Sequence, residues 1–181
     1  MVYILLGEGF EEAEAIVPGD LLRRAGVEVA YVGLEGPTVT GSHGITVTAD
    51  VTLEQVEADK MEMLVLPGGL GGVASIQMDL FATALIQKAR DLGCWLAAIC
   101  AAPSILAHMG MLDRRKAACN PCVWEEMGSA AVDREAQVVV DDRFVTAQAA
   151  GAAFPFGLKL VEVLKGAEAA QKVRDGVLYR G

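Results

Sequence analysis

Short apolar segments alternate along the chain with longer segments of helical periodicity. The apolar segments predict buried strands at 2–6, 27–32, 61–66, 94–99 and 144–147. The periodic segments predict helices at 11–25, 79–92, 151–164 and 168–175. Pro18 is expected to break or restart the first helix, and Gly26 to end it. Because fully apolar strands alternate with helices, the pattern predicts a mostly parallel sheet covered by helices on both faces.

Three stretches depart from this alternation. Residues 38–49 carry Ser42-His43-Gly44 between β-branched positions, which is typical of a hairpin. Residues 67–72, rich in glycine, are expected to form a loop after the third strand. Residues 111–142 are less regular, with short strands predicted around Ala117 and Val138 and a short helix near Val123. No repeat or linker divides the chain, so we expect one domain over 1–181.

Composition and charge narrow the classes of function. Apolar residues make up 53% of the chain, enough for a full core, and 24 Asp and Glu against 15 Lys and Arg give a net charge of −9. This charge argues against a nucleic-acid partner, because phosphate binding needs a basic surface. The first apolar segment is too short for a signal sequence or a membrane span. Four cysteines without a secreted framework predict reduced thiols and a cytoplasmic location.

Cys100 stands where a predicted buried strand meets a predicted helix. Pro103 suits the first turn of that helix, because its missing N–H costs nothing there. The sulfur would therefore lie over a helix N-terminus, whose free N–H groups and dipole favour a thiolate. We expect the pKa of the Cys100 thiol to be lowered, which makes it a candidate nucleophile.

Two further loops are expected to meet Cys100, because ligands bind at the carboxyl ends of parallel strands. They are residues 8–14 and 67–72. The backbone N–H groups of Gly69 and Ala101 are candidates for an oxyanion hole beside the sulfur. Glu14 is the carboxyl most suited to point at the thiol. Burial would raise its pKa, so that it donates a hydrogen bond or acts as a general acid or base.

Each feature also has a simpler interpretation. Cys100 alone is more often a small core residue, and the glutamates at 11, 12 and 14 suit the first turn of any helix. The glycines of 67–72 need make only a tight turn, and no Lys-Ser/Thr follows them, which excludes a P-loop. Cys119 and Cys122 have CxxC spacing, which leaves a redox pair open and makes zinc unfavourable without a second such pair. We expect no cofactor and no metal.

Three motifs together resemble a known family. They are Glu-Glu-Ala-Glu at 11–14, Leu-Pro-Gly-Gly at 66–69 and Ala-Ile-Cys-Ala-Ala-Pro at 98–103. The chain resembles the ThiJ/PfpI superfamily, and within it the branch of the Parkinsonism-associated deglycase and its bacterial relatives (the DJ-one branch). The resemblance implies a flavodoxin-like three-layer α/β/α sandwich, similar to class I glutamine amidotransferases, and a homodimer.

The resemblance also assigns roles to residues of this chain. It implies that Cys100 is a reactive, easily oxidised nucleophile and that Glu14 is its protonated hydrogen-bond partner. Gly69 and Ala101 match backbone oxyanion positions. Arg24 and His43 match positions that approach the site from the second subunit.

Two departures from the family pattern affect the site. Asn120 stands before Pro121 where relatives with stronger activity have a histidine, so this loop offers no Cys–His dyad. Gln148 lies beside an altered loop at 149–152, which changes the expected pocket wall. His108 is about two helical turns beyond Cys100 and is expected to point elsewhere.

The resemblance implies a cysteine-dependent protein that acts on reactive aldehydes in stress protection, as a cofactor-independent glyoxalase or deglycase. The alternative is a non-enzymatic sensor of oxidative stress, or a chaperone, that works through oxidation of Cys100. Amidase or peptidase activity is the least favoured alternative, because no histidine base is expected beside the thiol. The expected small-molecule partner is an aldehyde substrate or an oxidant.

Overall fold

The computed structural model describes residues 1–181 and contains one central seven-stranded sheet. Its strands are β1 Val2–Leu6, β2 Val29–Gly33, β5 Val51–Thr52, β6 Met63–Leu66, β7 Trp95–Ile99, β10 Val138–Asp141 and β11 Phe144–Ala147. They lie in the order β10-β11-β7-β6-β1-β2-β5, and only the β10–β11 pair is antiparallel. The expected mostly parallel, flavodoxin-like sheet is therefore confirmed.

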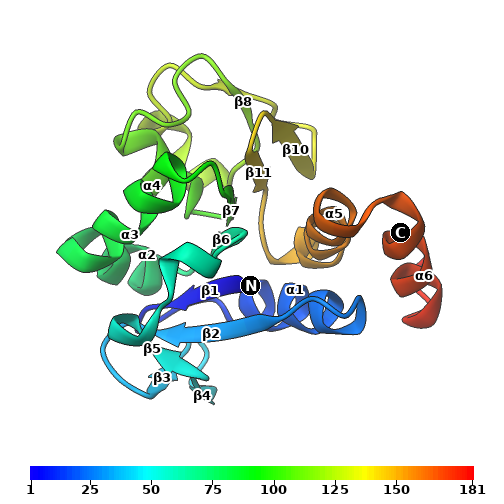
Figure 1. Cartoon of the computed structure of the whole chain (residues 1–181). Coiled ribbons are helices and arrows are strands. Elements are labelled where there is room, and N and C mark those ends of the chain that lie inside the picture. The colour runs from blue at the N-terminus through cyan, green and yellow to red at the C-terminus, as the bar shows by residue number, and fades with distance from the viewer.

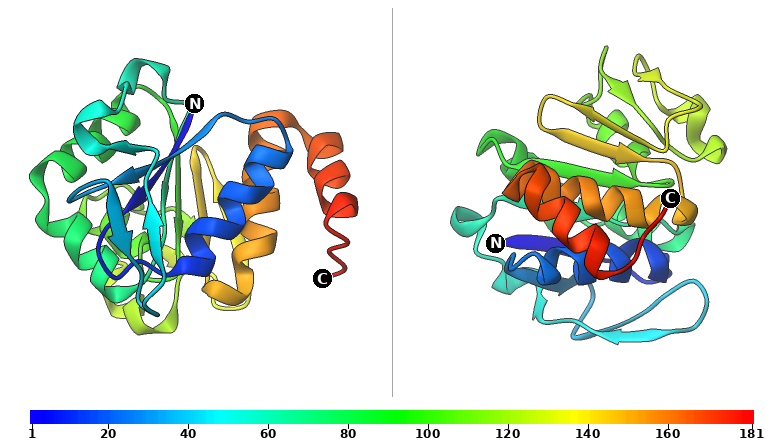
Figure 2. Two further views of the ribbon diagram at one scale, coloured as in Figure 1. Left: turned by 90° about the horizontal axis from the view of Figure 1, so that it is seen from below. Right: turned by 90° about the vertical axis from the view of Figure 1, so that its right-hand side faces the viewer.

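Helices flank the sheet on both faces (Figures 1 and 2). On one face lie α1 Glu12–Arg24 and α5 Ala153–Lys165, with α6 Ala167–Gly176 packed on the outer side of α5, and on the other lie α2 Leu70–Met78, α3 Leu80–Asp91 and α4 Pro103–His108. Strand side chains alternate between two apolar cores. In β6, Leu64 and Leu66 enter the core under α2, α3 and α4, whereas Met63 and Val65 enter the core under α1 and α5.

Smaller elements complete the fold. The predicted hairpin is confirmed as the antiparallel pair β3 Thr38–Thr40 and β4 Thr46–Thr48. The irregular region forms a short parallel pair, β8 Lys116–Ala117 and β9 Ala131–Val132. Four 3₁₀-helices are present: η1 Leu53–Gln55, η2 Ala58–Lys60, η3 Pro121–Glu126 and η4 Ala150–Ala152. The helix predicted near Val123 is therefore η3.

The predicted break at Pro18 is wrong, because α1 runs through this residue without interruption. Close packing around the proline holds the helix together. A side chain at Gly157 of α5 would place its Cβ 2.9 Å from Pro18 Cα, so only glycine lets the two helices approach this closely. A Cβ at Gly19 would overlap the Tyr31 ring in the same way. Tertiary packing therefore outweighs the hydrogen bond that proline removes.

One further prediction about local structure is wrong. The glycine-rich stretch after β6 is short, because helix α2 begins at Leu70, directly after Gly69 at φ +84°. Glycine has a low helix propensity, so the glycine-rich sequence favoured a loop. A Cβ at Gly72 would lie 2.8 Å from Phe10 Cα, which shows that contact with the first loop selects glycine here. The helix after Cys100 begins at Pro103, after a turn at 100–102, so Pro103 occupies its first turn as predicted.

No single helix is long and apolar enough to cross a membrane. Only α2 and α3 taken together reach that length and composition, and they are bent by 86° at their junction.

Candidate active site

The loops after β1, β6 and β7 meet at the carboxyl edge of the sheet. The Glu11 N–H donates to the Gly68 carbonyl at 2.9 Å, and the Gly68 N–H donates back to the Glu14 carboxyl at 2.9 Å. A Cβ at Gly68 would lie 2.5 Å from Glu14 Oε2 and 2.6 Å from the Cβ of Cys100. Glycine at this position therefore lets the carboxyl and the thiol share one small volume.

Cys100 occupies a strained turn that aims its side chain into this volume. Its φ is +66°, a left-handed conformation that costs a non-glycine residue about 1–2 kcal/mol. The strand pairing that continues on both sides holds it there: the Cys100 N–H donates to Ala147 at 3.0 Å, and the Cys100 carbonyl accepts from the Asn120 N–H at 2.8 Å. The N–H groups of Gly69 and Ala101 face the sulfur.

Glu14 is a buried carboxyl with few hydrogen-bond partners. It is 1% exposed, and its Oε2 accepts the Gly68 N–H. Its Oε1 is buried without a hydrogen-bond partner of ordinary geometry, and the Cys100 thiol is the side chain that can hydrogen-bond to the carboxyl. Burial raises the pKa of Glu14 to about 7, although contacts with Cys100 and Gly68 oppose the shift. Glu14 can therefore hold a proton near neutral pH.

The expected lowering of the Cys100 pKa is wrong. Burial, and then the charge and hydrogen bond of ionised Glu14, raise the pKa of the thiol to about 12, and the Ala101 and Gly69 N–H groups only reduce this shift. The effects of Glu14 depend on its ionisation. When Glu14 carries the proton, its repulsion disappears and its O–H can donate to the sulfur. The thiol and the carboxyl therefore titrate as a coupled pair.

Asn120 also contacts the sulfur. Its Nδ2 donates to Cys100 Sγ at 3.6 Å, and its Oδ1 accepts the Cys122 N–H at 3.0 Å, which caps the first turn of η3. An amide can orient the sulfur or a substrate oxygen, but it cannot remove a proton at neutral pH.

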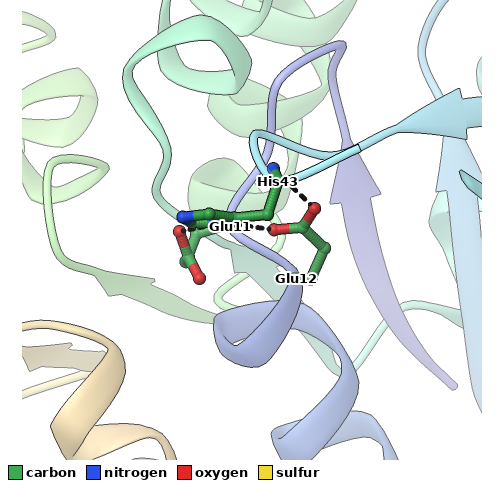
Figure 3. A group of neighbouring side chains, drawn as sticks. All are labelled: Glu11, Glu12 and His43. Atoms are coloured by element: carbon green, nitrogen blue, oxygen red, sulfur yellow. Dashed lines mark hydrogen bonds and ion pairs between the residues drawn. The ribbon is translucent and has the colours of Figure 1, made fainter. Parts of the chain in front are cut away.

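Glu11, Glu12 and His43 form a second cluster at the start of α1 (Figure 3). Glu12 accepts the His43 N–H at 2.8 Å and pairs with His43 Nδ1 at 3.0 Å, and Ile45 N–H and the Ser42 hydroxyl also donate to it. One ligand atom from each of the three cluster residues lies within 4.8 Å of the others, a spacing that suits a metal ion. The donors already bound to Glu12 give it a structural task, because they anchor the β3–β4 hairpin to α1.

The other residues predicted for the site lie outside this volume in the single chain. Arg24 is at the far end of α1 and pairs with Asp20 at 2.7 Å. The Gln148 side chain donates to the Arg134 carbonyl at 2.8 Å. His108 lies beside Gln77 and Glu126, as expected for a residue that points elsewhere.

Two functional features were missed in the sequence. The N–H of Gly68 was not singled out among the glycines of 67–72, yet it is the backbone partner of Glu14. Glu12 was grouped with its neighbours, although its partners come from a hairpin about 30 residues away. The one sequence feature that could have separated the roles of these glutamates is the Glu-Glu-Ala-Glu spacing, because positions 11, 12 and 14 of one helical turn face different neighbours.

Comparisons with known proteins agree with the geometry. The family model for the DJ-1/PfpI family matches residues 1–163. Protein dj-1beta of Drosophila melanogaster is 36% identical over 97% of this chain and 95% of its own length, and its crystal structure superimposes with a TM-score of 0.95 over 99% of this chain and 98% of that one.

Two further relatives carry names that describe an activity. A deglycase of Pyrococcus abyssi is 33% identical over 91% of this chain and 99% of its own length. The glutathione-independent glyoxalase DJR-1.2 of Caenorhabditis elegans is 32% identical over 91% and 88%, respectively. With a family model over most of its length and relatives that match from end to end, the chain belongs to the DJ-1/PfpI family.

Proposed function

We propose that this chain is a cofactor-independent enzyme that acts on small reactive aldehydes through Cys100, as a glyoxalase or deglycase. The observation that carries the proposal is the convergence of three groups on one sulfur: the buried Glu14 carboxyl and the N–H groups of Gly69 and Ala101. The names of the Pyrococcus and Caenorhabditis relatives support carbonyl chemistry.

The first step is addition of the Cys100 thiolate to the aldehyde carbon of a 2-oxoaldehyde such as methylglyoxal. Glu14 holds the proton that the thiol has released, which is possible because its pKa is about 7. The aldehyde oxygen becomes an alkoxide, and the N–H groups of Gly69 and Ala101 are placed to stabilise it. Protonation of the alkoxide gives a hemithioacetal.

The second step moves hydrogen from one carbon to the next. Glu14, ionised after it has protonated the alkoxide, removes the proton from the former aldehyde carbon and leaves an enediolate. After a proton passes from the oxygen of the former aldehyde to the oxygen of the neighbouring carbon, Glu14 returns its proton to that neighbouring carbon, which produces a thioester of lactate on Cys100. Water cleaves the thioester, so that methylglyoxal and one water become lactate and the thiol is restored. One carboxyl serves as acid and base in turn, which a pKa near neutrality favours.

Amide hydrolysis fits the site less well. Its leaving amine must be protonated, and a histidine beside the cysteine usually does this. The two histidines of the chain are bound elsewhere, His43 to Glu12 and His108 beside Gln77 and Glu126. The position next to the sulfur holds Asn120.

The proposal includes a cytoplasmic homodimer. Arg24 and His43 lie away from the sulfur of their own chain, so any contribution from them to the pocket would come from a second subunit. Both side chains are exposed and available for such a contact. Sedimentation of the purified protein at twice the chain mass supports this part of the proposal, and sedimentation as a monomer removes it.

The test of the proposed function is lactate formation from methylglyoxal without glutathione. We expect turnover by the wild type and a loss of more than about 1,000-fold in Cys100→Ala, because the covalent step is removed. Cys94→Ala is the matched control. Cys94 lies beyond the other end of β7, where its thiol donates to the Met61 carbonyl, and this variant should keep full turnover. A wild type that makes no lactate, or a Cys100→Ala variant that remains active, contradicts the proposal.

A further inference from the structure

The sulfur of Cys100 and the exposed residue Cys122 are separated by a single amide group. Asn120 donates from Nδ2 to Cys100 Sγ at 3.6 Å and accepts the Cys122 N–H on its Oδ1 at 3.0 Å. Both hydrogen bonds come from one planar side chain. The backbone of Cys122 therefore lies close to the reactive thiol, one side-chain amide away.

The other two cysteines are poorly placed to reach Cys100. Cys94 precedes β7, and a strand rise of about 3.3 Å per residue puts it roughly 20 Å away. Cys119 is 2% exposed and packs in the core under α2, α3 and α4, whereas Cys100 packs against the core on the other face of the sheet. Burial and then the nearby Cys122 raise the pKa of Cys119 to about 11, which keeps it as an unreactive thiol.

Cys122 lies exposed in the first turn of a short helical segment that Val123 anchors to the core. It begins η3, a 3₁₀-helix, whose hydrogen bonds have poorer geometry than those of an α-helix. The Cys122 N–H is bound by the Asn120 side chain, and Pro121 offers no N–H at all. A disulfide requires two Cα atoms about 4.4–6.8 Å apart, so the first turn of η3 must move toward Cys100 and displace the Asn120 amide.

We propose that Cys122 is a resolving thiol that forms an intramolecular disulfide with oxidised Cys100. The Cys100 thiolate attacks one oxygen of a hydroperoxide, which is reduced to water or an alcohol, while the sulfur becomes a sulfenic acid. The Cys122 sulfur then attacks the Cys100 sulfur. The S–O bond breaks, and the hydroxide leaves as water with the Cys122 proton.

The disulfide protects the nucleophile from irreversible loss. A sulfenic acid that meets no thiol is oxidised further to a sulfinic acid, whereas a disulfide is returned to two thiols by a dithiol reductant. The proposal rests on the reactivity of Cys100 given under the proposed function, but not on aldehyde turnover. It predicts that hydroperoxides inactivate the Cys100 thiol reversibly and that dithiols restore its reactivity.

The test is peptide mapping by mass spectrometry after treatment of the reduced protein with hydrogen peroxide and alkylation of the remaining thiols. We expect a Cys100–Cys122 cross-link within one chain in the wild type and in Cys119→Ala. In Cys122→Ser we expect a sulfenic acid on Cys100, trapped by dimedone, and accumulation of sulfinic acid at least about 10-fold faster. Dithiothreitol should restore the Cys100 thiol in the wild type and not in peroxide-treated Cys122→Ser.

Equal rates of sulfinic acid formation in the wild type and Cys122→Ser overturn the proposal. So does a cross-link that joins Cys119 to Cys122 or connects two chains. Reduced Cys122→Ser should keep its lactate formation, because Cys122 takes no part in the aldehyde reaction. A wild type without lactate formation overturns the proposed function and leaves the mapping result unaffected, so the two failures can be told apart.

Discussion

Glu12 and Glu14 are two carboxyls on the first turn of one helix, both almost inaccessible to solvent, and they titrate in opposite directions. Glu12 is 6% exposed and Glu14 is 1% exposed. Burial raises the pKa of both, but hydrogen bonds from His43 and from backbone N–H groups, including that of Ile45, bring the pKa of Glu12 down to about 2. The pKa of Glu14 rises to about 7.

Because helix position is nearly the same, the difference lies in the number of donors and in depth, since Glu14 is buried more deeply than Glu12. Glu12 receives hydrogen bonds on both oxygens from the β3–β4 hairpin, whereas Glu14 has one backbone donor and one oxygen without a partner. A carboxyl saturated with donors stays ionised and holds structure together. A carboxyl with too few donors becomes a proton carrier. From this comparison we expect Glu12 to stabilise the fold and Glu14 to transfer protons in the proposed reaction.

Glu14→Gln should have the largest effect, a loss of about 100- to 10,000-fold in methylglyoxal turnover. The amide can accept the Gly68 N–H and donate to the sulfur, but it cannot move a proton between carbons. Stability should change little near pH 5, where glutamine imitates the protonated acid. Steady-state kinetics beside thermal unfolding measures both, and full turnover in this variant would remove Glu14 from the reaction.

Glu12→Gln should have the opposite effect, with lower stability and unchanged turnover. The amide offers one acceptor oxygen and directs its NH₂ group at donors from the hairpin, so we expect a loss of about 2–3 kcal/mol in the free energy of unfolding. Turnover per folded molecule should remain close to that of the wild type. Urea denaturation provides the measurement. A variant as stable as the wild type would show that the four contacts contribute nothing net.

The two carboxyls should give stability opposite pH dependences. The folded-state pKa of Glu14, about 7, lies above its ordinary 4.5, so its contribution is complete below pH 4.5 and is lost as pH rises through 7. The wild type should therefore lose up to about 3 kcal/mol relative to Glu14→Gln between pH 5 and pH 8. Glu12 contributes fully above pH 4.5, and its contribution is lost as pH falls toward 2. Urea denaturation at pH 5 and pH 8 provides the measurement. The same difference in the free energy of unfolding between the wild type and Glu14→Gln at both pH values would contradict the raised pKa of Glu14.

The smallest effect concerns the strained turn at Cys100. Cys100→Gly and Cys100→Ala both remove the thiol, but only glycine adopts φ +66° without penalty. The glycine variant should be more stable than the alanine variant by about 1 kcal/mol. Chemical denaturation of the two variants gives the difference directly, and an alanine variant of equal or greater stability would show that the turn stores no strain.

Much of the sheet could be predicted because apolar periodicity reports burial directly. The strand before Cys100 and the helix after Gly166 follow from local pattern alone. The failures at Pro18 and Gly72 have one cause, since each residue is selected by a neighbour distant in the chain. Gly157 packs on Pro18, and Phe10 packs on Gly72. No local propensity contains that information.

In the candidate site, too, some features follow from the local sequence pattern and others depend on residues distant in the chain. Strand ends at one edge predicted that Glu14, Gly69 and Cys100 would meet, and the structure brings them together. The protonation states of Glu14 and Cys100 could not be predicted in this way, because they depend on how many hydrogen-bond donors reach each group and on how deeply each is buried. The helix-dipole argument for a lowered thiol pKa failed because burial of the sulfur, and then the charge of ionised Glu14, outweigh the partial charges on two N–H groups.

The most direct test of the central claim is a titration of the Glu12 and Glu14 side chains by carbon-13 NMR of their carboxyl carbons, assigned with Glu12→Gln and Glu14→Gln. The account predicts midpoints of about 2 for Glu12 and about 7 for Glu14. Two carboxyls that titrate together near the ordinary glutamate value of 4.5 would contradict it.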